Sequence, residues 1–195
     1  NLRVINEDKV LPGKGFGTHG HKDMEIISYV ISGELAHKDS MNNGSTIRHG
    51  DVQRMSAGTG VRHSEFNASQ TEVVHFLQIW ILPDKDNLKP GYEERNFADD
   101  RRNTLCELVS GVPKDTALHI NADIRLFGAE LGAEQTLSHN FAEHRHGWVQ
   151  LINGSLSISD GSISHTLSAG DGVSVSKVSI LTLKANEDCE FLLFE

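Results

Sequence analysis

Two short pairs of metal-ligand residue types stand out in this chain, His19-Gly20-His21 and His63-Ser64-Glu65. Residues two apart on a β-strand leave the same face, about 6.5 Å apart along it, so each pair would direct two ligands the same way. Three imidazoles and one carboxylate suit a first-row transition metal such as iron, manganese, cobalt, nickel or copper. In an octahedral shell, four protein ligands would leave two positions for exogenous molecules, and a reaction would take place there.

Histidine is frequent in this chain, which has 11 among 195 residues, so one His-x-His pair is weak evidence by itself. Most of the remaining histidines have no partner at ligand spacing on a convincing strand. We assign no role to six of them: His37, His49, His75, His119, His139 and His165.

The segments around the two pairs predict short strands joined by tight turns. The β-branched and apolar run 25–31 and the run 34–37 flank Ser32-Gly33, which predicts a hairpin. Turns or sharp bends are also predicted at Asn43-Gly44, at 48–51 and at the glycine-rich run 56–60. Short strands with glycine turns predict a small antiparallel barrel that brings both pairs together.

These segments resemble the two motifs of the cupins. The first cupin motif is matched by Gly17, His19, His21, Glu25 and Gly33. The second is matched by the stretch 50–67, although Ser56 stands where cupins usually have proline and Gly58 lies further from His63 than the general pattern allows. These departures indicate a subfamily.

Longer runs of the chain resemble the pirin family, in particular the bacterial pirin-like proteins described as quercetin 2,3-dioxygenases. The matching runs are 2–8, 15–25, 37–41 and 50–67. The resemblance is dense from Leu2 to Phe97 and thinner afterwards. It implies an all-β fold, a bicupin of two antiparallel β-barrel (jelly-roll) domains.

The resemblance also bears on which glutamate is the carboxylate ligand, a question that residue spacing leaves open. Glu25 has the same parity as His19 and His21, and general cupins use that glutamate as a ligand. In pirins the metal-binding glutamate instead follows the histidine of the second motif by two residues, which implies Glu65 here. Three interpretations of Glu25 stay open: it supports the ligands from beside them, it is a charge at the rim of the site, or it is a solvated carboxylate on a strand.

The implied site therefore consists of His19, His21, His63 and Glu65, holding one divalent transition metal. Iron is the expected ion, and manganese, cobalt, nickel, copper or zinc stay open.

The second half of the chain repeats the first in outline, since 151–156 echoes 30–35 and 169–172 echoes 49–52. Two similar barrels are therefore predicted. We expect the first barrel, with the metal site, in residues 1–90. The connector and the second barrel are expected in residues 91–195.

The second barrel is predicted to be metal-free. Aligning its turn glycines, Gly154 and Gly170, with those of the first barrel predicts the residues that replace the four ligands: Asn140, Ala142, Leu183 and Ala185. A second His-x-His pair, His144 and His146, lies four residues nearer its glycine turn than the first pair does. We expect this pair at the surface or at an interface.

Composition excludes several function classes. The formal charge is −9, from 18 basic and 27 acidic residues, with no Lys/Arg cluster, so direct binding to nucleic acid or to an anionic membrane is disfavoured. There is no apolar run of transmembrane length, no P-loop, no dinucleotide-binding glycine motif, no Gly-x-Ser-x-Gly elbow and no Cys-x-x-Cys. Two cysteines, Cys106 and Cys189, favour a reducing cytoplasm.

Two functions of different classes follow from the resemblance. One is a metal-dependent dioxygenase that takes O2 and a small aromatic, flavonol-like substrate, with Glu65 also acting as catalytic proton acceptor. The other is a non-enzymatic, metal-dependent redox regulator that acts through a protein partner. The similarity to the bacterial branch favours the enzyme. Pirins have a further segment before the run that begins at Leu2, so we expect this sequence to be trimmed.

Overall fold

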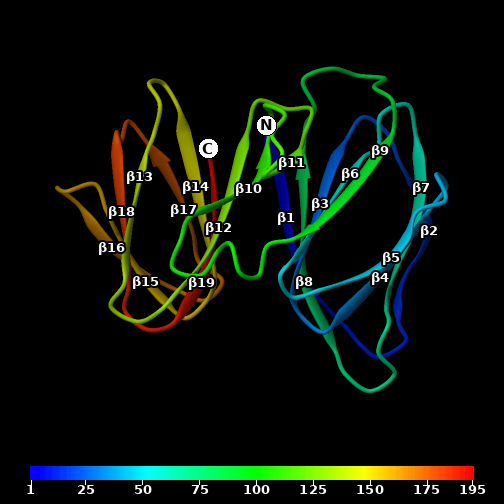
Figure 1. Ribbon diagram of the computed structural model, residues 1–195, viewed down its shortest axis with the longest axis horizontal. Helices are drawn as coiled ribbons and strands as arrows, with labels where there is room; N and C mark the ends of the chain where they lie inside the picture. Colours follow the sequence, from blue (N-terminus) through cyan, green and yellow to red (C-terminus); the bar gives the residue numbers. More distant parts are fainter. The chain divides into compact units, whose positions relative to one another are not determined.

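The computed structural model describes residues 1–195 and consists of strands joined by turns and loops (Figure 1). The chain forms two compact units. The first unit contains residues 1–98 and 110–123, and the second contains residues 99–109 and 124–195. No helix in the structure is long and apolar enough to cross a membrane. The prediction of an all-β chain is confirmed.

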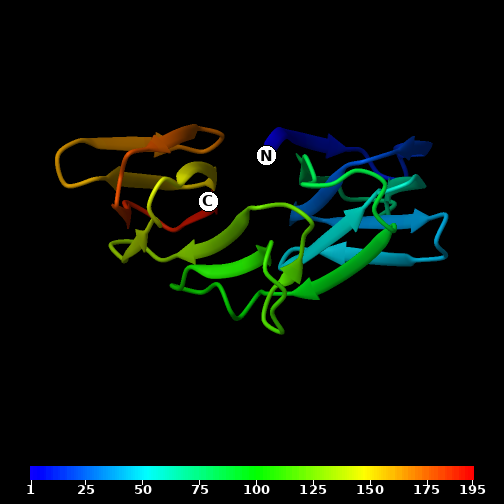
Figure 2. The same cartoon turned by 90° about the horizontal axis from the view of Figure 1, so that it is seen from above.

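The first unit is built from two antiparallel sheets, with strand orders β1-β8-β3-β6-β9 and β2-β7-β4-β5. The strands are β1 (Leu2–Val10), β2 (Gly15–His21), β3 (Glu25–Ser32), β4 (Glu34–Asp39), β5 (Gly44–Arg48), β6 (Asp51–Ser56), β7 (Val61–Asn67), β8 (Val74–Ile81) and β9 (Gly91–Asn96), with the short β11 (Leu118–His119). β9, green in Figure 2, forms one edge of its sheet. The first compact unit thus continues beyond residue 90, and a domain boundary at that position stays a prediction.

Gly33 joins the two sheets of the first unit. β3 pairs with β6 and β8, whereas β4 pairs with β5 and β7, so the predicted hairpin between 25–31 and 34–37 was wrong. A tight turn can join two paired strands of a hairpin or carry the chain from one sheet to the other. Which of the two forms depends on the strands with which each segment pairs. Gly33 has a φ of +80°, and a Cβ atom there would lie 2.6 Å from the carbonyl oxygen of Val73, so the turn requires glycine. The predicted turn at Asn43-Gly44 does connect a hairpin, β4–β5.

The interior of the first unit contains a polar layer between two apolar clusters. One cluster is Val30, Leu35, Ile47, Val74 and Phe76, and the other is Ile26, Met55 and Val61 with the partly buried Met24, Met41 and Trp80. Alternate residues of a strand share a face, so Ser28 lies between the clusters along β3. Gln78 lies between them along β8.

The second unit has the same kind of architecture with a different interior. Its strands are β10 (Cys106–Ser110), β12 (Arg125–Leu131), β13 (Thr136–Asn140), β14 (His146–Asn153), β15 (Ser155–Ser159), β16 (Ser164–Ser168), β17 (Gly172–Ser176), β18 (Ile180–Ala185) and β19 (Cys189–Phe194). The strands that this unit contributes to one sheet have the order β10-β12-β19-β14-β17, and the other sheet has the order β13-β18-β15-β16. A single apolar cluster, which runs from Phe127 to Leu193, fills the space between the sheets.

Candidate metal centre

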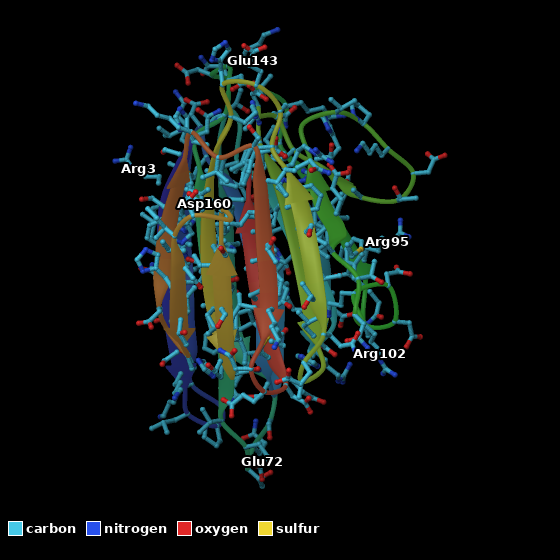
Figure 3. The ribbon with its side chains drawn as sticks, turned by 90° about the vertical axis from the view of Figure 1, so that its left-hand side faces the viewer. Arg3, Glu72, Arg95, Arg102, Glu143 and Asp160 are labelled. Atoms are coloured by element: carbon cyan, nitrogen blue, oxygen red, sulfur yellow. The ribbon has the colours of Figure 1, made fainter.

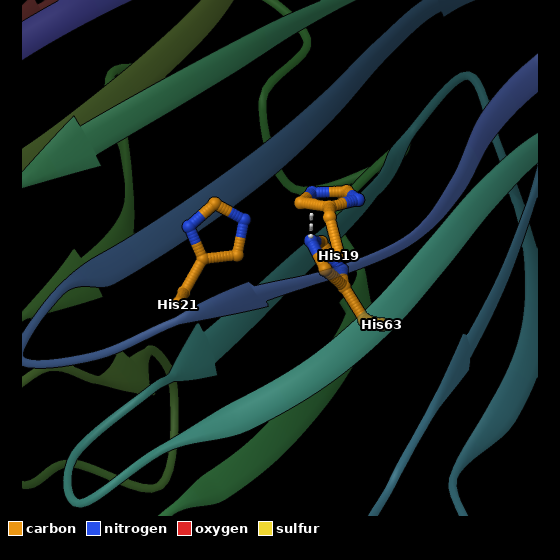
Figure 4. Close-up of side chains that lie close together, drawn as sticks. All are labelled: His19, His21 and His63. Atoms are coloured by element: carbon orange, nitrogen blue, oxygen red, sulfur yellow. Dashed lines mark hydrogen bonds between the residues drawn. The ribbon is translucent and has the colours of Figure 1, made fainter.

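Three histidine side chains from two paired strands converge inside the first unit (Figure 4). β2 carries His19 and His21, and β7 carries His63, which lies opposite His19 in the antiparallel register. The ring centroids are 4.4 Å apart for His19 and His63, 4.8 Å for His19 and His21, and 4.9 Å for His21 and His63. The ligand nitrogens of the three rings all lie within 4.8 Å of one another. The structure thus brings three of the four predicted site residues into one group.

The hydrogen bonds of these rings leave nitrogens available for a metal. His19 Nδ1 donates to the carbonyl oxygen of Gly17 at 2.8 Å, so its Nε2 carries a lone pair, and this Nε2 faces His63 Nε2 at 3.0 Å. The buried Nε2 of His21 has no hydrogen-bond partner, which is unfavourable for a buried polar atom. A divalent transition metal bound by the Nε2 atoms of His19, His21 and His63 would give each of them a partner. The hydrogen bond to the Gly17 carbonyl would orient the ring of His19. The residues present therefore fit such an ion.

Burial keeps His21 and His63 neutral, the form in which imidazole binds metals. The pKa of His63 is lowered to about 3, first by burial and then by the neighbouring His19, His21 and His37. The pKa of His21 is lowered by burial and by His19. Both rings therefore offer unprotonated nitrogens near neutral pH.

Glu65 lies two residues after His63 on β7, and both side chains are buried on the same face of the strand. Ser28 Oγ donates to Glu65 Oε1 at 3.1 Å, and Gln78 Nε2 donates to Oε2 at 2.5 Å. Burial raises the pKa of Glu65, although these two hydrogen bonds lower it. Ligand atoms of Glu65, His63 and His37 form a second group within 4.8 Å of one another. His63 belongs to both groups and so connects the carboxylate with the other two histidines.

His37, to which the sequence analysis gave no role, lies beside this site. It lies opposite Glu65 in the register of β4 and β7, and its ring centroid is 5.3 Å from that of His63. The ring of Tyr92 stacks on the ring of His37, with ring centroids 5.1 Å apart and an angle of 26° between the planes.

Hydrogen-bonding groups hold the His37 ring. Its Nδ1 lies 3.3 Å from Gln53 Nε2, and its Nε2 lies 3.4 Å from Asp39 Oδ2. The sequence does contain a signal for this placement, because Leu35, His37 and Asp39 alternate along one strand. With Leu35 in the core, His37 and Asp39 must face inward as well.

Glu25 lies away from the histidines. It is buried, and its carboxylate accepts hydrogen bonds from Ser56 Oγ at 2.8 Å and Asn121 Nδ2 at 3.0 Å, so the alternative of a solvated carboxylate was wrong. Its parity with the histidines was also misleading, because a loop separates β2, which ends at His21, from β3. On β3, Glu25 has the opposite parity to Ser28, the residue that contacts Glu65.

The second His-x-His pair lies at the surface, as predicted. His144 and His146 are exposed, the first 3.2 Å from Glu143 and the second 3.0 Å from Ser176 Oγ. Figure 3 shows Glu143 at the end of this loop, pointing away from the strands. The other histidines without an assigned role lie outside the two groups of the first unit: His49, His75, His119, His139 and His165.

Strand pairing shows which residues of the second unit correspond to the candidate ligands. In the first unit Leu35 lies opposite Asn67, and in the second Leu156 lies opposite Ala185. Each leucine follows its turn glycine, Gly33 or Gly154, by two residues. Ala185 therefore corresponds to Asn67, and not to Glu65 as predicted.

Counting back from this pair places Leu183 at the position of Glu65 and Leu181 at that of His63. His139 lies opposite Leu181 as His19 lies opposite His63, and Phe141 follows at the position of His21. The predicted replacements for the first pair, Asn140 and Ala142, are exposed, so that part of the alignment was wrong by one residue. A shift of one residue along a strand turns every side chain to the other face.

The sequence matches two family models. A model described as Pirin matches residues 1–81, and one described as quercetinase C-terminal cupin domain matches residues 107–195. The chain is also 39% identical over 194 residues to quercetin 2,3-dioxygenase of Escherichia coli strain K12, a match that covers 100% of the chain and 81% of the relative.

Solved structures are similar over nearly the whole chain. The crystal structure of YhhW from Escherichia coli matches with a TM-score of 0.92 at 39% identity, covering 99% of this chain and 80% of that one. The bacterial pirin YhhW from Escherichia coli in complex with nickel(II) matches with a TM-score of 0.90 at 39% identity, covering 99% and 81%. These similarities confirm the predicted fold of two antiparallel cupin barrels.

Proposed function

The chain belongs to the pirin family of bicupins, and from this premise we propose that it is a metal-dependent dioxygenase that acts on flavonol-like, quercetin-type substrates with O2. The observation that carries the proposal is the convergence of His19, His21 and His63, together with the buried Nε2 of His21 that has no hydrogen-bond partner. The name of the Escherichia coli relative, quercetin 2,3-dioxygenase, supports the reaction class.

We assign the metal to His19, His21, His63 and Glu65, with one ion per chain. The nickel(II) complex of the related Escherichia coli pirin supports a divalent metal. Iron is the ion we propose for this chain, because a donor set of imidazoles and a carboxylate with open positions suits iron and O2 chemistry.

A bound metal would supply Lewis acidity and positions for substrate oxygens and dioxygen. The protein's own residues then have distinct tasks. The neutral His21 and His63 present lone pairs, and the hydrogen bond that His19 Nδ1 donates to the carbonyl oxygen of Gly17 fixes the ring of His19. Glu65 accepts the proton of the flavonol 3-hydroxyl, a task for which burial prepares it by raising its pKa.

Other parts of the proposal follow from the sequence and the family. The partners are a small aromatic molecule and O2, with no direct contact to nucleic acid or membrane, and the location is the cytoplasm. The second unit holds no metal, because leucine and phenylalanine stand at three of its four equivalent positions.

Metal-loaded protein and quercetin test the proposal. Metal-free protein is loaded separately with Fe(II), Mn(II), Co(II), Ni(II), Cu(II) and Zn(II), and oxygen uptake, loss of quercetin absorbance and release of carbon monoxide are measured. We expect turnover with at least one ion and none without metal. Full metal occupancy without turnover for any ion would overturn the dioxygenase and favour the regulator that acts through a protein partner. Turnover that survives complete removal of the metal would overturn the mechanism.

A further inference from the structure

We propose that Gln78 and Trp80 are positioning residues that hold Glu65 in its metal-binding orientation. The inference rests on the proposed role of Glu65 as a ligand. It assigns a task to two residues that bind no metal themselves and that the sequence motifs did not single out.

A directional chain of hydrogen bonds runs from Trp80 to Glu65. The indole Nε1–H of Trp80 donates to Gln78 Oε1 at 3.1 Å, and Gln78 Nε2 donates to Glu65 Oε2 at 2.5 Å. An indole nitrogen can only donate, so it requires the oxygen of the Gln78 amide on its side. The amide nitrogen must then face Glu65, where it meets an acceptor.

Ser28 completes the support from the neighbouring strand. It lies opposite Gln78 in the register of β3 and β8, and its hydroxyl donates to the other oxygen of Glu65 at 3.1 Å. Both carboxylate oxygens are therefore held by donors, while each keeps a further lone pair for a metal. The outer contacts of metal ligands commonly orient them in this way.

Trp80 also touches a candidate ligand directly. Its ring meets the ring of His21 edge to face, with centroids 5.1 Å apart and 84° between the planes. The same indole packs against the cluster of Ile26, Met55 and Val61. One side chain thus connects the orientation of His21 with that of Glu65.

The second unit supplies an internal comparison for this assignment. Ser28 precedes its turn glycine by five residues, as Val149 precedes Gly154, and Val149 lies opposite Leu193 as Ser28 lies opposite Gln78. Glu65 itself corresponds to Leu183. All three counterparts belong to the apolar cluster of the second unit. Ser28 and Gln78 are polar in the unit with the candidate ligands, and their counterparts Val149 and Leu193 are apolar, as expected if the two polar residues serve Glu65.

Trp80→Phe tests the chain of hydrogen bonds, because it keeps an aromatic ring at this position and removes the N–H. The amide of Gln78 is then free to turn its oxygen toward Glu65, where two acceptors would oppose each other. We expect weaker Co(II) and Ni(II) binding by about 10- to 100-fold in chelator competition, and a changed visible absorption spectrum of the Co(II) protein. Gln78→Leu should have an effect of similar size.

Trp148→Phe is the matched control, since Trp148 Nε1 donates to Gln150 Oε1 at 3.2 Å in the second unit, the same Trp–Gln contact away from the site. It should leave metal affinity and the Co(II) spectrum unchanged. The Glu65→Gln background gives a second test, because a residue that acts through Glu65 should have little further effect there.

Three results would overturn the inference: unchanged affinity and spectrum in both Trp80→Phe and Gln78→Leu, equal losses in Trp148→Phe, or a full additional loss from Gln78→Leu in the Glu65→Gln background. These measurements use metal binding alone, so wild-type protein that binds metal without turning over quercetin leaves the inference standing. Wild-type protein that binds no metal overturns both the inference and the proposed function.

Discussion

The two units differ in polarity across six of their equivalent inward positions. In the first unit these positions hold polar residues, namely His19, His21, Ser28, His63, Glu65 and Gln78. In the second they hold His139, Phe141, Val149, Leu181, Leu183 and Leu193. The first interior is consequently divided into two small apolar clusters, while the second is one continuous cluster. One strand arrangement thus supports either a candidate metal site or a plain apolar core, depending on a few inward side chains.

His139 shows what happens to the one polar residue that the second unit keeps at these positions. It is buried between Phe127 and Phe141, with ring centroids 5.0 and 4.7 Å away, and its Nε2 lies 3.0 Å from Glu195 Oε2. In the first unit His21 Nε2 and His63 Nδ1 are buried without any such partner. A buried polar group without a partner costs free energy, so the first unit gives up stability, and a metal bound to His21 Nε2 would restore part of it.

The largest expected contrast between the units is in metal content. His63→Ala removes the residue shared by both groups of ligand atoms, so metal content should fall from one ion per chain to nearly none. His139→Ala, the matched change in the second unit, should leave metal content at one. Elemental analysis of protein purified without chelators measures both. Full metal with unchanged affinity in His63→Ala would show that the ligand assignment is wrong.

Glu65→Gln should separate catalysis from substrate binding. The amide keeps the shape of the side chain but accepts protons poorly and donates less charge to a metal. We expect kcat for quercetin to fall about a hundredfold or more, while KM changes much less. Steady-state oxygen uptake on metal-loaded protein gives both constants. A hundredfold rise in KM with an unchanged kcat would contradict the role of Glu65 as proton acceptor.

Exchanging residues between the units should have opposite effects on folding. Leu181→His places an imidazole in the apolar cluster and should lower the unfolding free energy by about 1–3 kcal/mol. His63→Leu, measured on metal-free protein, should leave it unchanged or raise it, because His63 Nδ1 has no hydrogen-bond partner. Denaturant unfolding measures both variants. Strong destabilisation by His63→Leu would mean that the polar layer stabilises the fold without metal.

Acid should destabilise the metal-free protein through the first unit. The pKa of His63 lies near 3 in the folded chain against 6.5 ordinarily, so below about pH 6.5 the unfolded chain binds a proton that the folded chain does not. Stability should therefore decrease as the pH falls from 6.5 toward 3. Unfolding free energies at a series of pH values should show this slope, and His63→Leu should reduce it. An identical slope in the variant would assign the acid sensitivity to other groups.

The smallest expected effect is that of the double change His144→Ala and His146→Ala. Both side chains are exposed and belong to no group of ligand atoms, so metal content and turnover should match the wild type. Elemental analysis with the quercetin assay checks this. A loss of one ion per chain would reveal a metal site in the second unit.

Much of the fold and of the candidate site can be predicted from the sequence, because a strand repeats every two residues. Parity alone places His19 with His21 and His63 with Glu65 on common faces, and glycine turns predict where strands end. The same rule failed where a loop intervenes. Glu25 has the right parity by number, but it begins a new strand and faces Ser56 and Asn121.

Which residues meet across strands was decided by the tertiary structure alone. The sequence by itself determined the all-β class, the repeated halves and the residue types for a metal. It could not place His37 beside His63, because that contact depends on the pairing of β4 with β7. Nor could it connect Gln78 to Glu65, because that contact joins β8 of one sheet to β7 of the other. Nor could it show that His139 and Leu181 replace His19 and His63. Strand register depends on pairing along whole sheets, and a loop that differs by one residue between the repeats reverses which side chains face inward.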